Sequence, residues 1–292
     1  MDNIKTILKL FIPPIILKLY SYIRKPKKNP IPNKNTIQFQ KTELAWVKTE
    51  LSWDDVLKQT SNGYSAEQIL TKCRDSLLKV KNGEFPYERD SVLFTEKEIF
   101  YPLLSSLLYV ALENDKKLNL IDFGGSLGST YFQNRDILKQ AGIDINWNIV
   151  EQDNFVKCGK EYFSNNELHF YNEIDELINK EGEVSVCIFS SVLPYLKEPY
   201  SIFDSIQRHN IKYIIIDRTL FLDNETEDIL SIQTIPPEIY EASYPAWFLS
   251  LNKFLDFFEH KYSIVFKWNC SDNVSLPSYK TSVMGFFLER IF

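Results

Sequence analysis

The sequence predicts an α/β fold in which a mostly parallel, Rossmann-like sheet of seven strands is covered by helices on both faces. Three observations predict it. Between residues 118 and 217, five short apolar runs alternate with segments of helical periodicity, which is typical of parallel strands joined by crossover helices. A glycine-rich loop follows the first run. The chain then ends in two strand-like runs without a helix between them, which predict an antiparallel hairpin.

The segment before the sheet is expected to be helical. Ser52 is placed to cap a first helix and Ser65 a second one, which runs to about Val80 and stops at Gly83. Leucines at helical spacing predict a third helix over 96–113. The sheet is therefore expected to carry a helical N-terminal extension.

The strands and helices of the sheet domain follow in order. The expected strands are 118–124, 147–151, 168–171, 184–190, 213–217, 262–268 and 282–292. The expected helices are 131–141, 154–163, 174–179, 199–208 and 249–259. These elements divide the chain into three parts, which are an arm with its linker (1–36), the helical extension (37–113) and the sheet domain (114–292).

Composition excludes several classes of protein. The chain has 292 residues, of which 44% are hydrophobic and 25% charged, so it is neither disordered nor fibrous. Its four cysteines and three histidines are scattered, so neither a disulfide scaffold nor a metal site is expected. The net charge of −6 argues against nucleic acid as the main partner. No pattern indicates an oligomeric state.

The net charge hides an asymmetry at the N-terminus. Residues 1–41 hold nine Lys and Arg against one Asp, a net of +8, so the remainder carries −14. The stretch 4–23 is apolar, but lysines interrupt it and Pro13-Pro14 lie inside its longest uncharged run, which is too short to span a membrane. No small-residue cleavage site follows it.

Two interpretations of this arm remain. In the first, residues 4–28 lie peripherally on an anionic membrane, at the inner face of the cytoplasmic membrane, with apolar side chains in the headgroup region and basic residues on the phosphates. In the second, the apolar stretch packs on its own domain or on a second subunit. Both place the protein in the cytoplasm.

The loop over 122–130 is the motif that indicates chemistry. Glycines directly after a buried strand allow a ligand to approach the backbone, and the loop leads into the N-terminus of a helix. The dinucleotide fingerprint G-x-G-x-x-G is not matched, because the run from Gly124 reads G-G-S-L-G. The second strand ends at Glu151, where an acidic side chain can accept protons from both hydroxyls of a ribose.

With these features the chain resembles the class I S-adenosylmethionine-dependent methyltransferases over roughly residues 90–292. Asp122, Gly124 and Gly128 match the family's acidic-x-G-x-G-x-G motif, whereas Ser126 replaces its middle glycine. The resemblance implies S-adenosyl-L-methionine as cofactor. It implies cofactor contacts by the first-strand loop, the ribose carboxylate, the end of the third strand and the loop after the fourth strand: Asp122, Gly124, Gly125, Ser126, Gly128, Glu151, Gln152, Tyr171, Asn172, Ser190 and Ser191.

A narrower likeness concerns methyltransferase-like proteins encoded in bacterial surface-polysaccharide (O-antigen or capsule) gene clusters. It is carried by FGGSLGSTYFQNR, WNIVEQ, SSVLPYL, IIIDRT and PPEIYEASYPAWF. The function that it implies is O-methylation of a sugar in a surface polysaccharide or its precursor. Two alternatives remain open, which are methylation of a lipid or small metabolite and a non-catalytic binding module.

Two polar residues at the end of the fifth strand are candidates for the acceptor side. Asp217 is a candidate general base for a hydroxyl acceptor. Arg218 is a candidate for binding an anionic group of the acceptor, such as a uronic acid or a phosphate. The alternatives are that Asp217 pairs with Arg218 or caps the loop, and that Arg218 forms a surface salt bridge.

Aromatic residues supply the remaining candidates. The insertion 235–247 is rich in proline and aromatic residues, whose rings suit the faces of sugars. Tyr195 is a candidate catalytic residue, and Tyr244 and Trp247 are candidates for substrate binding. The alternative is that these rings pack a lid over the cofactor.

Overall fold

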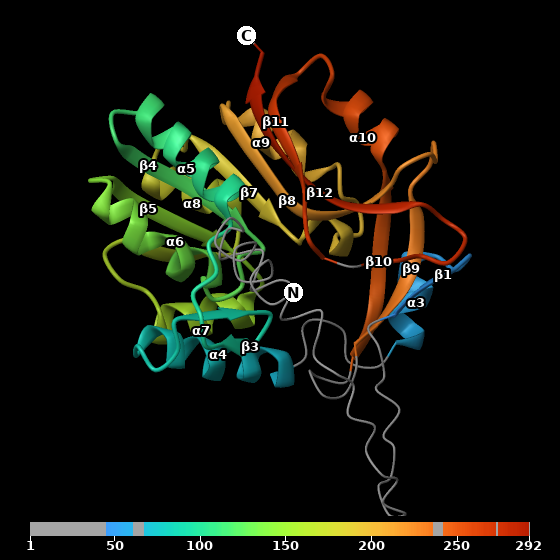
Figure 1. The fold of residues 1–292 in the computed structure, drawn as a ribbon, viewed down its shortest axis with the longest axis horizontal. Coiled ribbons are helices and arrows are strands. Elements are labelled where there is room, and N and C mark those ends of the chain that lie inside the picture. The colour runs from blue at the N-terminus through green and yellow to red at the C-terminus, as the bar shows by residue number, and fades with distance from the viewer. Residues whose placement is uncertain (1–44, 61–66, 236–241, 273, 292) are drawn as a thin grey trace, which may run out of the picture. The chain divides into compact units, whose positions relative to one another are not determined.

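The computed structural model describes residues 45–60, 67–235, 242–272 and 274–291 (Figure 1). The predicted arm and linker (1–36) and the cap at Ser65 lie outside these ranges. In the part of the chain that is described, no helix is long and apolar enough to cross a membrane.

One large sheet organises the described chain. Its ten strands are β1 (Ala45–Lys48), β4 (Lys117–Phe123), β5 (Asp144–Val150), β6 (Leu168–Tyr171), β7 (Val186–Ser190), β8 (Tyr213–Leu222), β9 (Ile229–Ile235), β10 (Ala242–Ser250), β11 (Tyr262–Asn269) and β12 (Thr281–Arg290). The main path runs β1-β9-β10-β8-β7-β4-β5-β6, and β12 joins β8 and carries β11 (Figure 1).

The centre of this sheet confirms the predicted fold. Strands β6, β5, β4, β7 and β8 are neighbours and all pair in parallel. Strand β12 pairs antiparallel with β8, and β11 pairs antiparallel with β12. The result is the mostly parallel, Rossmann-like sheet with an antiparallel carboxyl-terminal hairpin.

Helices cover both faces of the sheet, because its strands are apolar on both sides. In β7, Val186 and Ile188 pack into one core, while Cys187 and Phe189 pack into the other. The first core is closed by α4 (Glu67–Lys81), α5 (Tyr101–Glu113), α6 (Ser129–Gln140) and α7 (Asp153–Tyr162). The second is closed by α8 (Ile174–Glu181), α9 (Ile202–Arg208) and α10 (Leu251–Phe258).

The segment before the sheet is helical in part. Helix α3 (Trp53–Gln59) has the predicted cap, because the Ser52 hydroxyl accepts a hydrogen bond from the Asp55 backbone N–H. Helix α4 ends at the predicted stop signal, where Gly83 has a φ of +78°. Helix α5 begins at Tyr101 rather than at residue 96, with Pro102 in its first turn.

A hairpin that the sequence pattern did not predict lies between these helices. Strands β2 (Tyr87–Arg89) and β3 (Val92–Phe94) pair antiparallel across a two-residue turn. Asp90 and Ser91 form this turn with φ of +51° and +65°. Such a turn needs positive φ at both positions, so Asn-Gly is its usual sequence and Asp-Ser gives only a weak signal.

The insertion after the fifth strand is also more ordered than predicted. Strands β9 and β10 pair antiparallel, and β1 from the N-terminal extension adds to β9. Residues 236–241 between them lie outside the described ranges. The short 3₁₀ helix η1 (Leu193–Tyr195) follows β7 and packs close to β10. These extra strands widen the sheet on the side where the predicted acceptor residues lie.

Candidate functional site

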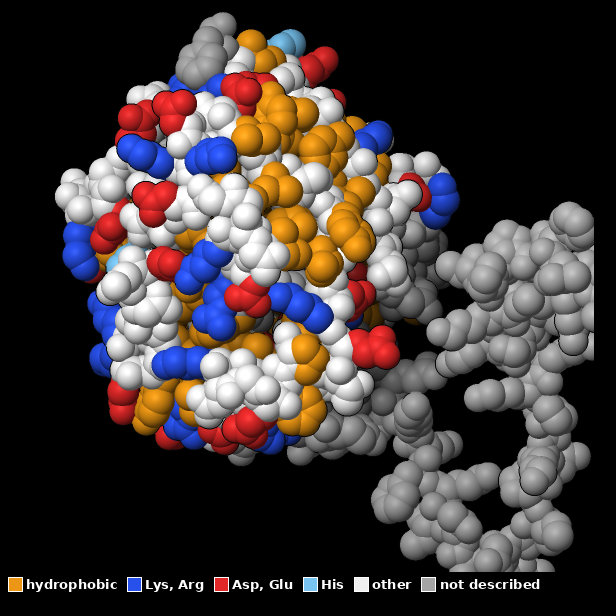
Figure 2. Space-filling model, turned by 60° about the vertical axis from the view of Figure 1, so that its left-hand side comes forward, with side chains coloured by type: hydrophobic (Ala, Val, Ile, Leu, Met, Phe, Trp, Pro, Cys, Tyr) orange, Lys and Arg blue, Asp and Glu red, His pale blue; other side chains and the backbone are white. Residues whose placement is uncertain are grey.

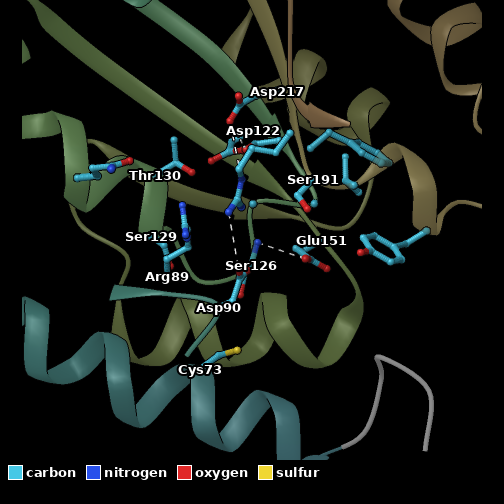
Figure 3. A pocket seen from close by; sticks show the side chains of 18 of the residues that line it. Cys73, Arg89, Asp90, Asp122, Ser126, Ser129, Thr130, Glu151, Ser191 and Asp217 are labelled. Atoms are coloured by element: carbon cyan, nitrogen blue, oxygen red, sulfur yellow. Dashed lines mark hydrogen bonds and ion pairs between the residues drawn. The ribbon is translucent and has the colours of Figure 1, made fainter. Parts of the chain in front are cut away.

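A cavity of about 580 Å³ opens where the parallel strands β4, β5, β7 and β8 end. In an open α/β sheet this edge is where ligands bind, and the volume lies in the range of small-molecule sites. Polar side chains enter it from several elements, with Thr130 and Ser129 from α6, Ser191 and Glu151 from strand ends, and Asp217 from β8 (Figure 3).

The glycine-rich loop forms the floor of the cavity. After β4 the backbone turns at Gly124, whose φ is +69° and whose N–H donates to the Val150 carbonyl over 2.9 Å. A Cβ at Gly124 would lie 2.4 Å from Val192 Cγ2, so only glycine lets the loops after β4 and β7 meet. Ser126 also has positive φ, at +52°, and Gly128 is the N-cap of α6.

Glu151 lies at the end of β5 and faces this loop. Its Oε1 accepts from the Ser126 N–H over 3.2 Å and its Oε2 from the Gln152 N–H over 2.8 Å. The residue is 9% exposed. Burial raises its pKa to about 7, against the opposing effect of the two backbone N–H groups. A carboxylate offers about four acceptor positions, so two remain for a ligand.

The Asp122 side chain packs against the glycine-rich loop at Gly125. It is 1% exposed and its Oδ2 accepts from the Trp147 indole N–H over 3.0 Å. Burial raises the pKa of Asp122 to about 7, and the nearby Glu151 carboxylate adds to the rise. The main cause of the rise is therefore burial, and the charge of Glu151 is a lesser one.

Most of the predicted cofactor residues line the cavity. They are Asp122, Gly124, Gly125, Ser126, Glu151, Gln152, Asn172, Ser190 and Ser191. Gly128 and Tyr171 do not. Gly128 packs against Leu168 beneath the loop, and the Tyr171 hydroxyl donates to Glu181, with Lys180 over its ring, which turns it towards α8.

Asp217 and Arg218 both line the cavity because β8 is irregular there. Met284 of β12 pairs with Thr219 and Phe286 with Ile216, so Asp217 and Arg218 share the single position opposite Gly285. This is a β-bulge, and Arg218 takes a φ of +47° in it. In a regular strand the two side chains would point to opposite faces.

The Asp217 carboxylate is buried and held from two sides. It is 3% exposed, accepts from Ser190 Oγ over 2.9 Å, and accepts from the Trp268 indole N–H over 3.2 Å. Burial raises its pKa, while Arg218, Ser190 and Trp268 oppose the rise. Trp268 reaches it only because position 285 is glycine, where a Cβ would lie 2.1 Å from the indole.

Arg218 lies among carboxylates. Its guanidinium is 3.5 Å from Asp90 and 3.9 Å from Asp217. Burial alone would lower its pKa, but the charges of Asp90, Asp217 and Asp272 raise it above the ordinary value. The predicted anion-binding residue is therefore already neutralised by the protein, which weakens the expectation of a strongly anionic acceptor.

The predicted aromatic residues separate. Tyr195 of η1 and Tyr244 of β10 both line the cavity and contact each other edge to face, with ring centroids 5.6 Å apart. Trp247 lies outside the cavity and stacks on Trp53 of α3 with centroids 5.9 Å apart. Successive residues of a strand point to opposite faces. Trp247 lies three residues after Tyr244 in β10, so its side chain points away from the cavity.

Sequence reasoning missed a second group of cavity residues. The β2–β3 hairpin contributes Arg89 and Asp90, and strand β9 contributes Gln233. The hairpin is held at the cavity by Glu88, whose carboxylate accepts from the Ser91 N–H over 2.6 Å and from the Ser129 hydroxyl over 2.5 Å. The only sequence signal for β9 is weak, because apolar and polar residues alternate in LSIQ but not over the whole run ILSIQTI.

Comparisons with known proteins give distant structural similarities. No protein-family model and no curated protein matches the chain. The magnesium protoporphyrin IX methyltransferase of Synechocystis with bound S-adenosylmethionine is 13% identical, with 65% of this chain and 79% of that chain covered and a TM-score of 0.41.

Two other solved structures are similar to the same degree. The glycopeptide N-methyltransferase MtfA, complexed with S-adenosylmethionine, is 7% identical, with 64% of this chain and 92% of that chain covered and a TM-score of 0.43. The N-terminal domain of EvdMO1, in the presence of SAH and D-fucose, is 13% identical, with coverages of 74% and 96% and a TM-score of 0.42. Likeness this distant carries no argument about activity, which is inferred from the cavity itself.

Proposed function

We propose that the protein is an S-adenosylmethionine-dependent methyltransferase. The observation that carries the proposal is the Glu151 carboxylate at the end of β5, which faces the glycine loop and keeps two acceptor positions towards the cavity. A nucleoside ribose offers two adjacent hydroxyl donors to such a group. The dinucleotide fingerprint is absent from the loop, which favours the methyl donor over a nicotinamide cofactor.

The residues of the cavity fit this cofactor. Glu151 would hold the ribose of the cofactor, and Asn172 and Gln152 would contact its adenine base. The loop from Gly124, together with Ser191, would hold its amino-acid part. When bound, S-adenosylmethionine supplies a methyl group on a sulfonium that an oxygen or nitrogen nucleophile can accept.

The chain's own residues would bind the acceptor and take up its proton. We propose that Asp217 is the general base for a hydroxyl acceptor, since it is buried beside the loop after β7 and its pKa is raised. Arg218 and the rings of Tyr195 and Tyr244 would orient the acceptor over the same wall.

For the acceptor we propose a sugar hydroxyl of a bacterial surface polysaccharide or its precursor. Support comes from the aromatic pair, from the polar side chains that surround it, and from the sequence likeness to proteins of surface-polysaccharide gene clusters. The apolar, basic residues 4–28 would hold the protein at the inner face of the cytoplasmic membrane.

The test is methyl transfer from labelled S-adenosylmethionine into cell fractions of lipid, polysaccharide and nucleotide sugar. We expect label in the polysaccharide or nucleotide-sugar fraction, and none with the Asp217→Asn variant. Label confined to lipid would reject the sugar acceptor. No transfer to any fraction, with tight cofactor binding retained, would favour a non-catalytic binding module.

A further inference from the structure

The added strands β9 and β10 form one wall of the cavity. Gln233 and Ile235 of β9 line it, whereas Thr234 between them is exposed on the opposite face. Gln233 is the register partner of Tyr244, which lines the same wall. The wall therefore carries an amide directly beside the aromatic pair.

The oxygen of the Gln233 amide has no hydrogen-bond partner among the described residues. The residue is 4% exposed, and this Oε1 is buried. Leaving a buried acceptor unpaired is unfavourable, and nearly all buried polar groups in proteins have partners. The oxygen itself is closed to water, but the residue lines the cavity, so a ligand there can donate to this oxygen once the amide turns towards it.

The surroundings of Gln233 indicate the chemistry of that ligand. The ring faces and edges of Tyr195 and Tyr244 offer apolar contact, while Asp217 and Arg218 offer charged acceptor and donor groups on the adjoining wall. A ring with apolar C–H faces and several hydroxyl groups uses both kinds of contact. A lipid chain would offer no hydrogen-bond donor to the amide oxygen of Gln233.

We propose that β9 and β10 form the acceptor subsite and that Gln233 determines specificity by accepting a hydrogen bond from a hydroxyl group of a sugar ring. The inference rests on the proposed methyltransferase function, which it deepens by assigning the acceptor's binding wall. A site built to bond a hydroxyl rejects analogues that lack it. Gln233 therefore selects acceptors that carry a hydroxyl group at one particular position of the ring.

One feature of the sheet offers a competing explanation. Trp46 of β1 is the other register partner of Gln233, and its indole Nε1 is also buried without a hydrogen-bond partner among the described residues. If the two groups serve each other in solution, Gln233 has a structural role. The experiment therefore includes Trp46→Phe, which removes the indole donor and keeps an aromatic ring.

Saturation-transfer NMR tests the subsite with defined probes. The full-length protein, with saturating S-adenosylhomocysteine, is mixed with methyl glycosides of glucose, galactose, mannose, rhamnose and fucose. The variants are Gln233→Met, which keeps the length of the side chain, Trp46→Phe, and the matched control Thr234→Val on the exposed face of β9. Thermal midpoints and S-adenosylhomocysteine affinity establish that each variant is folded.

We expect at least one glycoside to bind the native protein, with roughly tenfold weaker binding to Gln233→Met, as for the loss of one hydrogen bond of about 1.4 kcal/mol. Thr234→Val, Trp46→Phe and the S-adenosylhomocysteine affinity should be unchanged, and a deoxy analogue should lose affinity for the native protein only. Unchanged glycoside binding by Gln233→Met would overturn the proposal, as would an equal loss in Trp46→Phe.

Two further outcomes separate this inference from the proposed function. Native protein that binds S-adenosylhomocysteine but none of the glycosides would overturn the sugar subsite and leave the methyltransferase proposal standing. Native protein that binds a glycoside through Gln233 but no S-adenosylhomocysteine would support the subsite and overturn the methyltransferase proposal.

Discussion

At the scale of single residues, the site depends on carboxyl groups that the fold buries at a cost. Asp122 lies near the end of β4 and Glu151 directly after the end of the neighbouring β5, and burial raises the pKa of each to about 7. An ionised carboxylate in this position destabilises the folded protein without a ligand. A ligand that donates hydrogen bonds to Glu151 recovers part of that free energy, which is typical of functional sites.

The raised pKa values predict how stability depends on pH. Between about pH 4 and pH 7 the folded protein binds more protons at these carboxyls than the unfolded chain does, so the free energy of unfolding falls as pH rises through this window. Glu151→Gln should remove its share of the fall, on the order of 3 kcal/mol, and should be more stable than native protein at pH 8.

Urea unfolding at pH 5 and pH 8 measures this difference. The exposed Glu225 provides the control, because Glu225→Gln changes the same chemical group outside the cavity. If the native protein and Glu151→Gln show the same change in unfolding free energy between the two pH values, the buried carboxylate does not carry the cost assigned to it.

At the scale of elements, the bulge in β8 explains why two adjacent charged residues reach one cavity. Asp217 and Arg218 stand opposite Gly285, and the indole of Trp268 lies where a Cβ at 285 would be. Alternation in a regular strand would have separated the two side chains, so no periodicity of the sequence predicts this arrangement.

A double-mutant cycle tests this part of the site. Gly285→Ala should destabilise the protein by about 1–3 kcal/mol, because the new methyl group overlaps Trp268. In a Trp268→Leu background most of that cost should disappear, since the overlapping ring is gone. Chemical unfolding measures all four proteins. Additive free energies would show that Gly285 and Trp268 do not constrain each other.

The central elements could be predicted from sequence, and the added ones could not. The strands β4 to β8 are short apolar runs between helices, and the loop at Gly124 follows the first of them, so periodicity and glycines identify both. Strand β10 contains Pro245, which argues against a strand. It is tolerated because this part of β10 pairs with β9 alone.

The missed half of the site follows from those missed elements. Arg89 and Asp90 enter the cavity from a hairpin whose turn lacks the usual Asn-Gly signal. Gln233 enters from β9, and nothing in a single sequence shows that this strand joins the sheet next to β10. Residues next to the glycine loop were predictable because the chain itself places them there, whereas these contacts depend on tertiary structure.

At the scale of the whole molecule, charge is divided unequally along the chain. Residues 1–41 carry a net of +8 and the remainder −14. Basic residues near an anionic membrane contribute about 1 kcal/mol each, and the apolar residues of 4–23 would add to this by insertion. The arm, and not the acidic remainder, should therefore determine any membrane binding.

The described surface also carries apolar side chains, which gather over one part of the view in Figure 2. Tyr101 and Leu112 of α5 and Ile264 of β11 are among the exposed ones. A protein without the arm keeps this apolar surface, so its behaviour shows whether the surface alone binds a membrane.

Flotation with liposomes separates the two interpretations of the arm. Full-length protein should float with vesicles that contain anionic lipid, and should do so less as salt increases. A chain that begins at Asn35 should remain in the soluble fraction. Equal flotation of both proteins would contradict a membrane role for residues 4–28 and would favour packing of the arm on protein.

The central claim is that the cavity at the ends of β4 and β5 binds S-adenosylmethionine through Glu151. Calorimetric titration with S-adenosylhomocysteine tests it most directly. Native protein should bind at one site per chain. Glu151→Ala should weaken binding by at least tenfold, as for loss of hydrogen bonds to a charged acceptor worth about 1.5–3 kcal/mol, and Glu225→Ala should not change it. Absence of binding by native protein, or equal affinity in Glu151→Ala, would contradict the account.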